Sequence, residues 1–233
     1  NASARARSAT AKANARLVRP PAITAQSDMR QSTQKSTAMV RHVKCADGSA
    51  FKGVDGVCYD DEGNLWMLNS DQMNRKGGIR ILTPDRRWLS LDYTDFPKGA
   101  PSLDDILFTS GGQVWINSER VEAGLFVLDT KGTLEDRSDD RTRWISSFYD
   151  QDGKSIDIFT VHCVAEGRDG SLWIGPTHGP VIMRQPRTVF DVTTPVFYRV
   201  KVPRNDGTDE ADYLLENSRV WCIAVDGADR KWI

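Results

Sequence analysis

The stretch that decides the fold is Thr160 to Gly175, which reads T-V-H-C-V-A-E-G-R-D-G-S-L-W-I-G. A β-branched run is followed by an Asp-Gly turn and then by a short strand that carries a tryptophan. The same parts recur in the same order at three other places, Gly53 to Leu68, Asp105 to Asn117 and Arg219 to Ile233. The tryptophans at the shared position are Trp66, Trp115, Trp173 and Trp232, which are 49, 58 and 59 residues apart. Short strands and turns that repeat at roughly this period are typical of the blades of a β-propeller.

Each repeat extends into four predicted strands. In the third copy we expect strands at Val161 to Ala165, Leu172 to Gly175, Val181 to Arg184 and Phe197 to Val202, because β-branched residues alternate with polar ones there. The matching third strands of the first two copies are Gly78 to Leu82 and Gly124 to Leu128, and the matching fourth strands are Trp88 to Leu91 and Trp144 to Phe148. The sequence therefore predicts an all-β fold, a β-propeller of four-stranded antiparallel blades with the tryptophans packed between blades.

The two ends of the chain carry partial repeats. Met39 to Cys45 is similar to Tyr198 to Pro203, so we expect it to be the last strand of a blade, and Ile233 falls within the second strand of another blade. The count is about three complete blades and two partial ones, whereas closed propellers typically have four to eight. We expect an incomplete part of a larger propeller. A small closed ring, in which the N-terminal strand completes the last blade, is the alternative.

The composition separates a basic segment, residues 1–37, from the propeller part, residues 38–233. Residues 1–44 hold nine Lys or Arg and one acidic residue, Asp28. Because residues 1–37 contain no aromatic residue and no glycine, we expect them to be disordered or irregular, with an Ala-rich helix from Ala2 to Leu17 as the alternative. No stacking aromatics accompany the basic residues, which disfavours nucleic-acid binding. No apolar run approaches a membrane span, and no apolar core of a signal peptide follows the early arginines.

The predicted blade order puts long polar loops on one face. The connections from second to third strands and from one blade to the next are long, whereas most of the other turns are short. Since binding residues tend to lie on long loops of a rigid scaffold, we take the long-loop face as the ligand or partner face. Its candidate residues are Asn69, Arg75, Arg120 and His178. The blade-connecting loops of this face are expected at Asp92 to Ser102, Asp150 to Asp157 and Arg204 to Asn217.

Residues that carry chemistry are few. The cysteines Cys45, Cys58, Cys163 and Cys222 have no metal-type spacing, and three of them lie on predicted first strands, so buried free thiols are expected; a Cys45–Cys58 bridge stays geometrically possible. His162 is expected to be a satisfied core histidine. The acidic run Asp129 to Asp140 lacks regular calcium-loop spacing, which favours a solvated hairpin loop. We expect no catalytic residues, no cofactor and no metal ligands.

The repeats D-G-S-L-W-I-G and A-V-D-G-A-D-R-K-W-I resemble those of two-component regulator propellers, the extracytoplasmic sensor modules of Bacteroidetes hybrid histidine kinases. Three longer segments, from Leu128 to Phe148, Val202 to Asn217 and Ala224 to Ile233, resemble the propeller part of PorZ-like proteins, components of the type IX secretion system's attachment complex. That resemblance implies export to the periplasm or cell surface of a Gram-negative bacterium. It also implies a non-enzymatic role with a partner sortase, and binding of lipopolysaccharide.

Three functional classes follow. The first is a non-enzymatic assembly component that binds protein partners or a surface glycolipid. The second is an oligosaccharide-sensing periplasmic propeller of a hybrid histidine kinase. The third is a propeller lyase or lactonase, whose repeats also contain D-G-x-L-W but whose chemistry requires histidine or acidic residues converging on the channel; His178 alone supports it here.

Overall fold

The computed structural model describes residues 54–71, 76–93, 96, 103–118 and 123–233. These residues belong to the unit Lys44–Ile233. The basic segment 1–37 and the strand predicted at Met39 to Cys45 lie outside the described residues, as does Cys45. Within the described part the elements are strands and one short 3₁₀ turn, η1 (Pro186–Thr188). No helix in the described residues is both long enough and apolar enough to cross a membrane.

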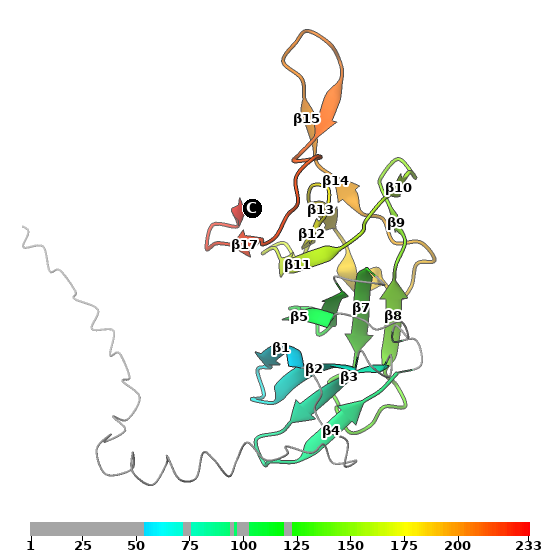
Figure 1. The fold of residues 1–233 in the computed structure, drawn as a ribbon, viewed down its shortest axis with the longest axis vertical. Coiled ribbons are helices and arrows are strands. Elements are labelled where there is room, and N and C mark those ends of the chain that lie inside the picture. Colours follow the sequence, from blue (N-terminus) through cyan, green and yellow to red (C-terminus); the bar gives the residue numbers. More distant parts are fainter. Residues whose placement is uncertain (1–53, 72–75, 94–95, 97–102, 119–122) are drawn as a thin grey trace, which may run out of the picture. The chain divides into compact units, whose positions relative to one another are not determined.

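Three four-stranded antiparallel sheets follow one another along the chain (Figure 1), and each is one blade. The first blade contains β1 (Val54–Tyr59), β2 (Leu65–Asp71), β3 (Lys76–Leu82) and β4 (Trp88–Leu91). The second contains β5 (Leu103–Phe108), β6 (Val114–Ser118), β7 (Gly124–Asp129) and β8 (Arg141–Ile145). The third contains β11 (Val161–Glu166), β12 (Leu172–Pro176), β13 (Val181–Met183) and β14 (Tyr198–Arg199). The fourth copy of the motif forms a hairpin of β17 (Ala224–Val225) and β18 (Lys231–Trp232). The prediction of propeller blades is confirmed.

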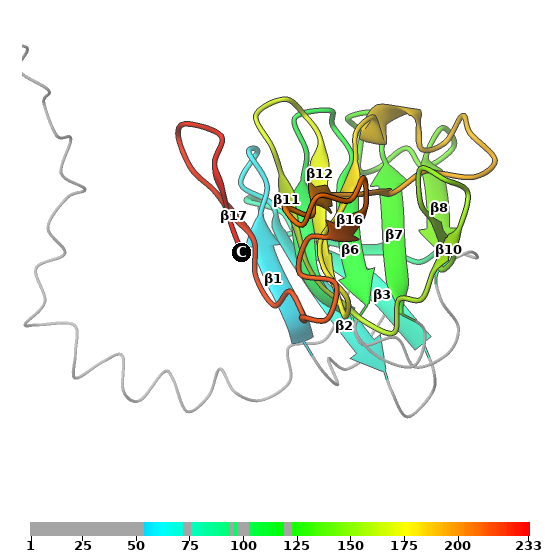
Figure 2. The same ribbon diagram turned by 90° about the horizontal axis from the view of Figure 1, so that it is seen from above.

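The tryptophan occupies the same register in all four copies. Trp66 lies opposite Cys58, Trp115 opposite Leu107, Trp173 opposite Ala165 and Trp232 opposite Ala224. The innermost strands also contact one another in sequence, β1 with β5, β5 with β11 and β11 with β17, and Figure 2 shows β1, β11 and β17 on the same side of the sheets. The repeated motif therefore sets the inner part of every blade.

The Asp-Gly element of the repeat is a tight turn with one residue in the left-handed region. In the third blade the N–H of Gly167 donates to the carbonyl of Ser171 at 2.8 Å, and Gly170 has a φ of 78°. The first two copies have Gly63 and Gly112 at the same point, with φ of 82° and 78°, and the fourth has Asp229 at 63°. Because only glycine adopts this conformation without steric cost, the recurring glycine is explained by the turn.

The central strands are buried on both faces, because each face packs against a neighbouring blade. In β7 the side chains of Phe126 and Leu128 pack in a core shared with the first blade, whereas Leu125 and Val127 pack in a core shared with the third. The strand alternates strictly between the two, as a period of two requires. Trp66 is 2% exposed and Trp115 1%, and each faces the following blade, as predicted. Trp173 is partly buried, and Trp232 is 60% exposed, so the prediction is wrong for Trp232. Burial of each large apolar side chain is worth about 1.5–3 kcal/mol, so these two seams are the main stabilising element.

Several predicted strand boundaries are wrong, and pairing explains why. The fourth strand of the second blade is Arg141–Ile145 and not Trp144 to Phe148, because Asp129 pairs with Arg141 and Leu125 with Ile145. The remaining Phe148–Tyr149 form β9, which pairs with β10 (Ser155–Ile156) within the predicted irregular loop. An apolar run such as W-I-S-S-F fits several registers, and only the neighbouring strand selects one.

The predicted last strand of the third blade, Phe197 to Val202, is also divided. Its residues Tyr198–Arg199 stay in the blade as β14, while β15 (Lys201–Pro203) leaves it and pairs with β16 (Ala211–Tyr213). The expected irregular loop Arg204 to Asn217 therefore contains half of a hairpin. In Figure 1 this hairpin projects beyond β13 and β14.

The expectation of three buried cysteines is correct for one of them. Cys163 is 9% exposed, Cys58 is partly buried, and Cys222, which precedes β17 and is not part of it, is exposed. All three are free thiols. Burial raises the pKa of the Cys163 thiol to about 12 from its ordinary 9.0.

We expect Cys222 to react with iodoacetamide well before Cys163. The thiolate is the reactive form, and Cys163 is both shielded and held protonated at neutral pH. Mass-spectrometric peptide mapping at increasing reaction times measures each cysteine separately, and a sample labelled in urea supplies the fully reactive control. Equal labelling rates of the two cysteines in the folded protein would contradict this burial pattern.

One buried amide joins the second and third blades. Asn117 is 1% exposed; its Oδ1 accepts the backbone N–H of Asp105 at 3.1 Å and its Nδ2 donates to the carbonyl of Val161 at 2.8 Å. The pairing of β5 with β6 shifts register next to Asp105, so this amide replaces a missing ladder bond.

Replacing Asn117 with Ala should lower the free energy of unfolding by about 1–3 kcal/mol, because the buried carbonyl of Val161 and the N–H of Asp105 lose their partner. Urea denaturation followed by far-ultraviolet circular dichroism measures the loss. The control is Gln185→Ala, since the Gln185 side chain is exposed. Equal stability of the two variants would show that the amide does not join the blades.

Candidate functional site

Of the four residues predicted for the ligand face, the structure places the side chain of one. His178 lies on the connection between β12 and β13 and is exposed. Asn69, predicted on a connection between strands, lies within β2 (Leu65–Asp71), because its backbone pairs with Gly78 of β3. The side chain of Asn69 and the whole of Arg75 and Arg120 lie outside the described residues. Of the predicted face, the structure therefore describes side chains around His178 alone among the four candidates.

Rings and hydroxyl groups gather around His178. The ring of Phe159 lies 6.3 Å from the His178 ring, edge to face. Next to them, the Thr160 hydroxyl is 2.8 Å from the Thr177 hydroxyl and 3.0 Å from Nε2 of His162. The His162 ring in turn stacks on Trp221 at 4.2 Å. We call this set the His178 cluster: Phe159, Thr160, His162, Thr177, His178 and Trp221.

The chain segments that carry the cluster are fixed by backbone contacts. The N–H of Gly179 donates to the carbonyl of Ser218 at 3.0 Å, and the N–H of Val220 donates to the carbonyl of Pro176 at 3.1 Å. A Cβ on Gly179 would lie 2.5 Å from the Leu214 carbonyl oxygen, so only glycine allows the two segments to approach this closely. These contacts bring Trp221 and His178, 43 positions apart, to one place.

The cluster presents apolar rings to solvent. Phe159 is 68% exposed and Trp221 62%, and the guanidinium of Arg219 lies 6.0 Å from the Trp221 ring. Exposed aromatic rings beside polar groups are typical of binding surfaces, where Trp, Tyr and Arg supply most of the binding free energy. The arrangement therefore suits recognition of a ligand or partner.

Sequence reasoning identified only part of this cluster. His162, expected in the core, is partly buried and stacks on an exposed ring. Phe159 and Trp221 were not predicted as site residues. The sequence contained one sign of this site, because Trp221 is a second tryptophan in the fourth copy and is not the repeat tryptophan. In the structure it lies between the buried residues Val220 and Ile223.

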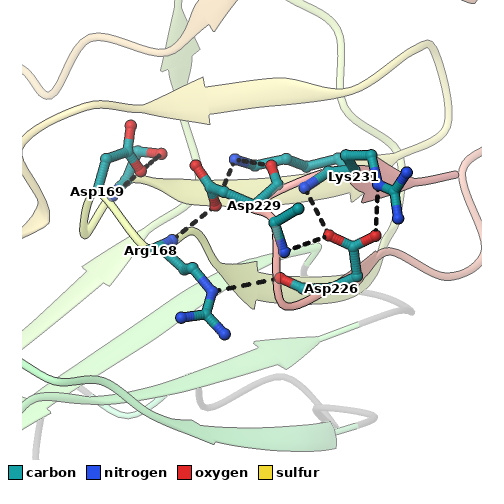
Figure 3. A network of polar contacts seen from close by, with 8 residues as sticks. Arg168, Asp169, Asp226, Asp229 and Lys231 are labelled. Carbon is teal, nitrogen blue, oxygen red and sulfur yellow. Dashed lines mark hydrogen bonds and ion pairs between the residues drawn. The ribbon is translucent and has the colours of Figure 1, made fainter. Parts of the chain in front are cut away.

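The short-turn face carries a polar network, which Figure 3 shows between the turns of the third and fourth copies. The backbone N–H of Arg168 donates to Oδ1 of Asp229 at 2.8 Å, and its Nε donates to the Asp226 carbonyl at 3.3 Å. Lys231 forms an ion pair with Asp229 at 2.8 Å, and its ammonium lies 5.4 Å from the Trp173 ring. These contacts join neighbouring repeats, and their role is structural.

The acidic run Asp129 to Asp140 disperses its carboxylates. Asp129 pairs with Lys131, Glu135 pairs with Arg87 of the first blade, and Asp140 accepts the Tyr93 hydroxyl at 2.6 Å. Nowhere in the described residues do three or more His, Cys, Asp or Glu side chains gather as metal ligands would. The run links the first two blades.

Acid should weaken the fourth-copy hairpin between about pH 4 and pH 2. Hydrogen bonds from the backbone N–H and the guanidinium of Arg230 hold the pKa of Asp226 at about 2, below its ordinary 3.8. A carboxyl with a lowered pKa in the folded state stabilises the fold while ionised, and this contribution disappears as the pH falls through the folded-state pKa.

The measurement is an NMR titration of the Asp226 side-chain carboxyl and of the Trp232 indole N–H, which donates to Asp226 at 3.2 Å. Both resonances should shift with a midpoint near pH 2. In Asp226→Asn the indole shift over this range should vanish. A carboxyl midpoint at the ordinary value would contradict the hydrogen-bonded geometry.

Comparisons with known proteins give similarity to solved structures. No family model matches the sequence, and no curated protein sequence matches it. The chain is similar to PorZ of Porphyromonas gingivalis, an essential bacterial surface component of the type-IX secretion system, with 26% identity and a TM-score of 0.69. This similarity covers 82% of the present chain and 25% of the PorZ chain, so the chain spans about a quarter of that structure.

Two other solved structures are less similar to this chain. The extracellular domain of a putative hybrid two component system from B. thetaiotaomicron is 18% identical over 79% of this chain and 19% of its own, with a TM-score of 0.44. Virginiamycin B lyase from Staphylococcus aureus is 14% identical over 77% of this chain and 48% of its own, with a TM-score of 0.42. Among these three, the similarity is greatest to PorZ.

Proposed function

We propose that this chain is a non-enzymatic, extracytoplasmic binding module that holds protein partners in a bacterial surface assembly of the kind to which PorZ belongs. The observation that carries the proposal is the similarity to PorZ over 82% of the chain with a TM-score of 0.69. PorZ is described as a surface component of a secretion system, which suggests periplasmic or cell-surface placement for this chain too.

The His178 cluster is the proposed contact surface. Its residues lie on connections between strands and between blades, except for His162, which lies on β11. The blades beneath are held together by two buried seams. A rigid scaffold lowers the entropic cost of binding because the contact residues are already positioned. Phe159 and Trp221 would supply the apolar anchors, with Arg219 and His178 at the rim.

A surface glycolipid is the second candidate ligand. The observation that favours it is the paired hydroxyls of Thr160 and Thr177, 2.8 Å apart, next to a stack of His162 on Trp221. A flat ring and adjacent hydrogen-bonding groups suit a sugar of a glycolipid headgroup. Binding of purified lipopolysaccharide to the parent chain and to Trp221→Ala distinguishes this ligand from a protein.

Replacing Trp221 with Ala should lower partner capture by about tenfold or more, because exposed tryptophans at the centre of an interface are typical hot spots. The tagged full-length protein is cross-linked in its native cells, and co-purifying proteins are quantified by mass spectrometry. The matched control is Trp232→Ala, since Trp232 is 60% exposed but lies in the fourth-copy hairpin. Cell fractionation of the same strains tests the placement.

The proposal predicts that the parent and Trp232→Ala capture the same proteins, whereas Trp221→Ala does not. Capture that is equal in all three would remove the His178 cluster from the interface. Absence of any specific partner, or location of the protein in the cytoplasmic fraction, would overturn the proposed function.

A further inference from the structure

The hairpin of β15 and β16 is exposed along its length, except at Tyr213 at its base. Every residue from 201 to 212 is exposed, and the hairpin packs none of these side chains into the cores of the blades. Figure 1 shows it extending away from the third blade, and β15 and β16 form a sheet of two strands. Such a ribbon is marginal in water unless it is supported at its base or by a partner.

Ionic contacts keep this hairpin formed. Nη1 of Arg204 pairs with Glu210 and Nη2 with Asp212, both at 2.6 Å, across the two strands. At the tip, Asp206 accepts the N–H of Thr208 at 3.0 Å, and Gly207 has a φ of 83°. These contacts fix the ribbon without burying it.

The base of the hairpin is tied to its surroundings. The guanidinium of Arg199 lies 3.5 Å from the Tyr213 ring and pairs with Glu216 at 2.9 Å. Lys201 pairs with Asp152 in the neighbouring β9–β10 hairpin at 2.8 Å. A ribbon held in this way is presented to solvent in one orientation.

The pairing register shows which backbone groups face outward. The N–H of Arg204 donates to the Glu210 carbonyl at 2.9 Å, and the N–H of Leu214 donates to the Val200 carbonyl at 2.8 Å. Hydrogen-bonded and non-hydrogen-bonded pairs alternate in an antiparallel ladder, so the intervening pair Pro203–Ala211 is non-hydrogen-bonded. The backbone groups of Pro203 and Ala211 therefore point away from the opposite strand.

The two edges of the ribbon are thus unequal. The β15 edge lacks a donor at Pro203, and proline on an edge strand is a usual protection against pairing. The β16 edge offers the N–H and carbonyl of Ala211 and the N–H of Tyr213, while the Tyr213 carbonyl already accepts from Glu216 at 3.3 Å. Only the β16 edge presents a donor, an acceptor and a second donor in sequence.

We infer that the β16 edge accepts an extended, basic segment of a protein partner as a third strand, an inference that rests on the proposed protein-binding function. Addition of a strand to an exposed edge is a common mode of peptide recognition. Residues 201–212 hold four acidic residues and two basic ones, Lys201 and Arg204, both already engaged in ion pairs. The remaining negative charge selects a partner strand that carries Lys or Arg.

The test uses a synthetic peptide of about ten residues that alternates lysine and valine, with a glutamate–valine peptide of equal length as the charge control. Binding to the full chain is followed by NMR shifts and by hydrogen exchange of individual amides. The lysine peptide should bind and slow exchange of the Ala211 and Tyr213 amides, whereas the glutamate peptide should not bind. Salt at about 1 M should weaken binding, since exposed charges are then screened.

The decisive variant is Ala211→Pro, which removes the outward donor of β16 in the same way that Pro203 removes that of β15. It should weaken binding of the lysine peptide by about tenfold. One hydrogen bond to the added strand is lost, and the proline ring obstructs its approach. Pro203→Ala restores a donor on the β15 edge and should not weaken binding, because the β16 edge is unchanged. Exchange of the Arg204 and Leu214 amides reports whether the hairpin remains folded, and Asp209→Lys tests the charge without touching the backbone.

Equal binding of the peptide to the parent and Ala211→Pro, equal binding of both peptides, or exchange protection elsewhere would overturn the inference. Its failure is separable from failure of the proposed function. If partners are captured in cells equally by the parent and Ala211→Pro, strand addition is wrong and protein binding stands. If no partner is captured, the proposed function fails, and with it the claim of a protein partner at this edge.

Discussion

The structure depends on the strict alternation of side chains along central strands that are buried on both faces. In β7 the residues Leu125 and Val127 belong to one seam and Phe126 and Leu128 to the other, so the second blade contributes to two cores. A single four-stranded sheet cannot bury its own two apolar faces. A neighbouring blade on each side covers them. The repeat tryptophans extend the same rule, since Trp66 and Trp115 each fill the seam toward the following blade.

Hydrogen bonds between specific residues also join neighbouring blades across these apolar seams. Asn117 replaces a ladder bond where β5 shifts register, and it reaches Val161 of the next blade. On the short-turn face, Ser110 donates to Glu166 and Arg168 to Asp229, each from one turn to the next repeat. Exposed hydrogen bonds of this kind each contribute little to stability, but they join specific points of neighbouring repeats. The apolar seams supply the stability, and the polar contacts set the register.

The two surfaces that do not serve the fold lie beside each other in the chain. The His178 cluster exposes Phe159 and Trp221, and the β15–β16 hairpin exposes a free backbone edge. Residues 214–220 connect them, since this segment leaves the hairpin and then contacts Pro176 and Gly179. Partner recognition by rings at one place and by a backbone edge at the other would combine two contacts of modest strength on one rigid blade.

The sequence by itself determined the repeat, the all-β class, the strand order and the glycine-bearing turns, because these follow from local alternation and from backbone conformations that few residues adopt. It also placed His178 on the correct loop. Tertiary structure alone decided that the third blade ends at Arg199, that Phe148 and Tyr149 leave the second, and that Cys222 is exposed. It also decided that Phe159 lies against His178 and that Trp221 stacks on His162. The physical reason is that strand register and side-chain burial depend on which neighbouring strand completes the pairing, and residues distant in sequence supply that neighbour.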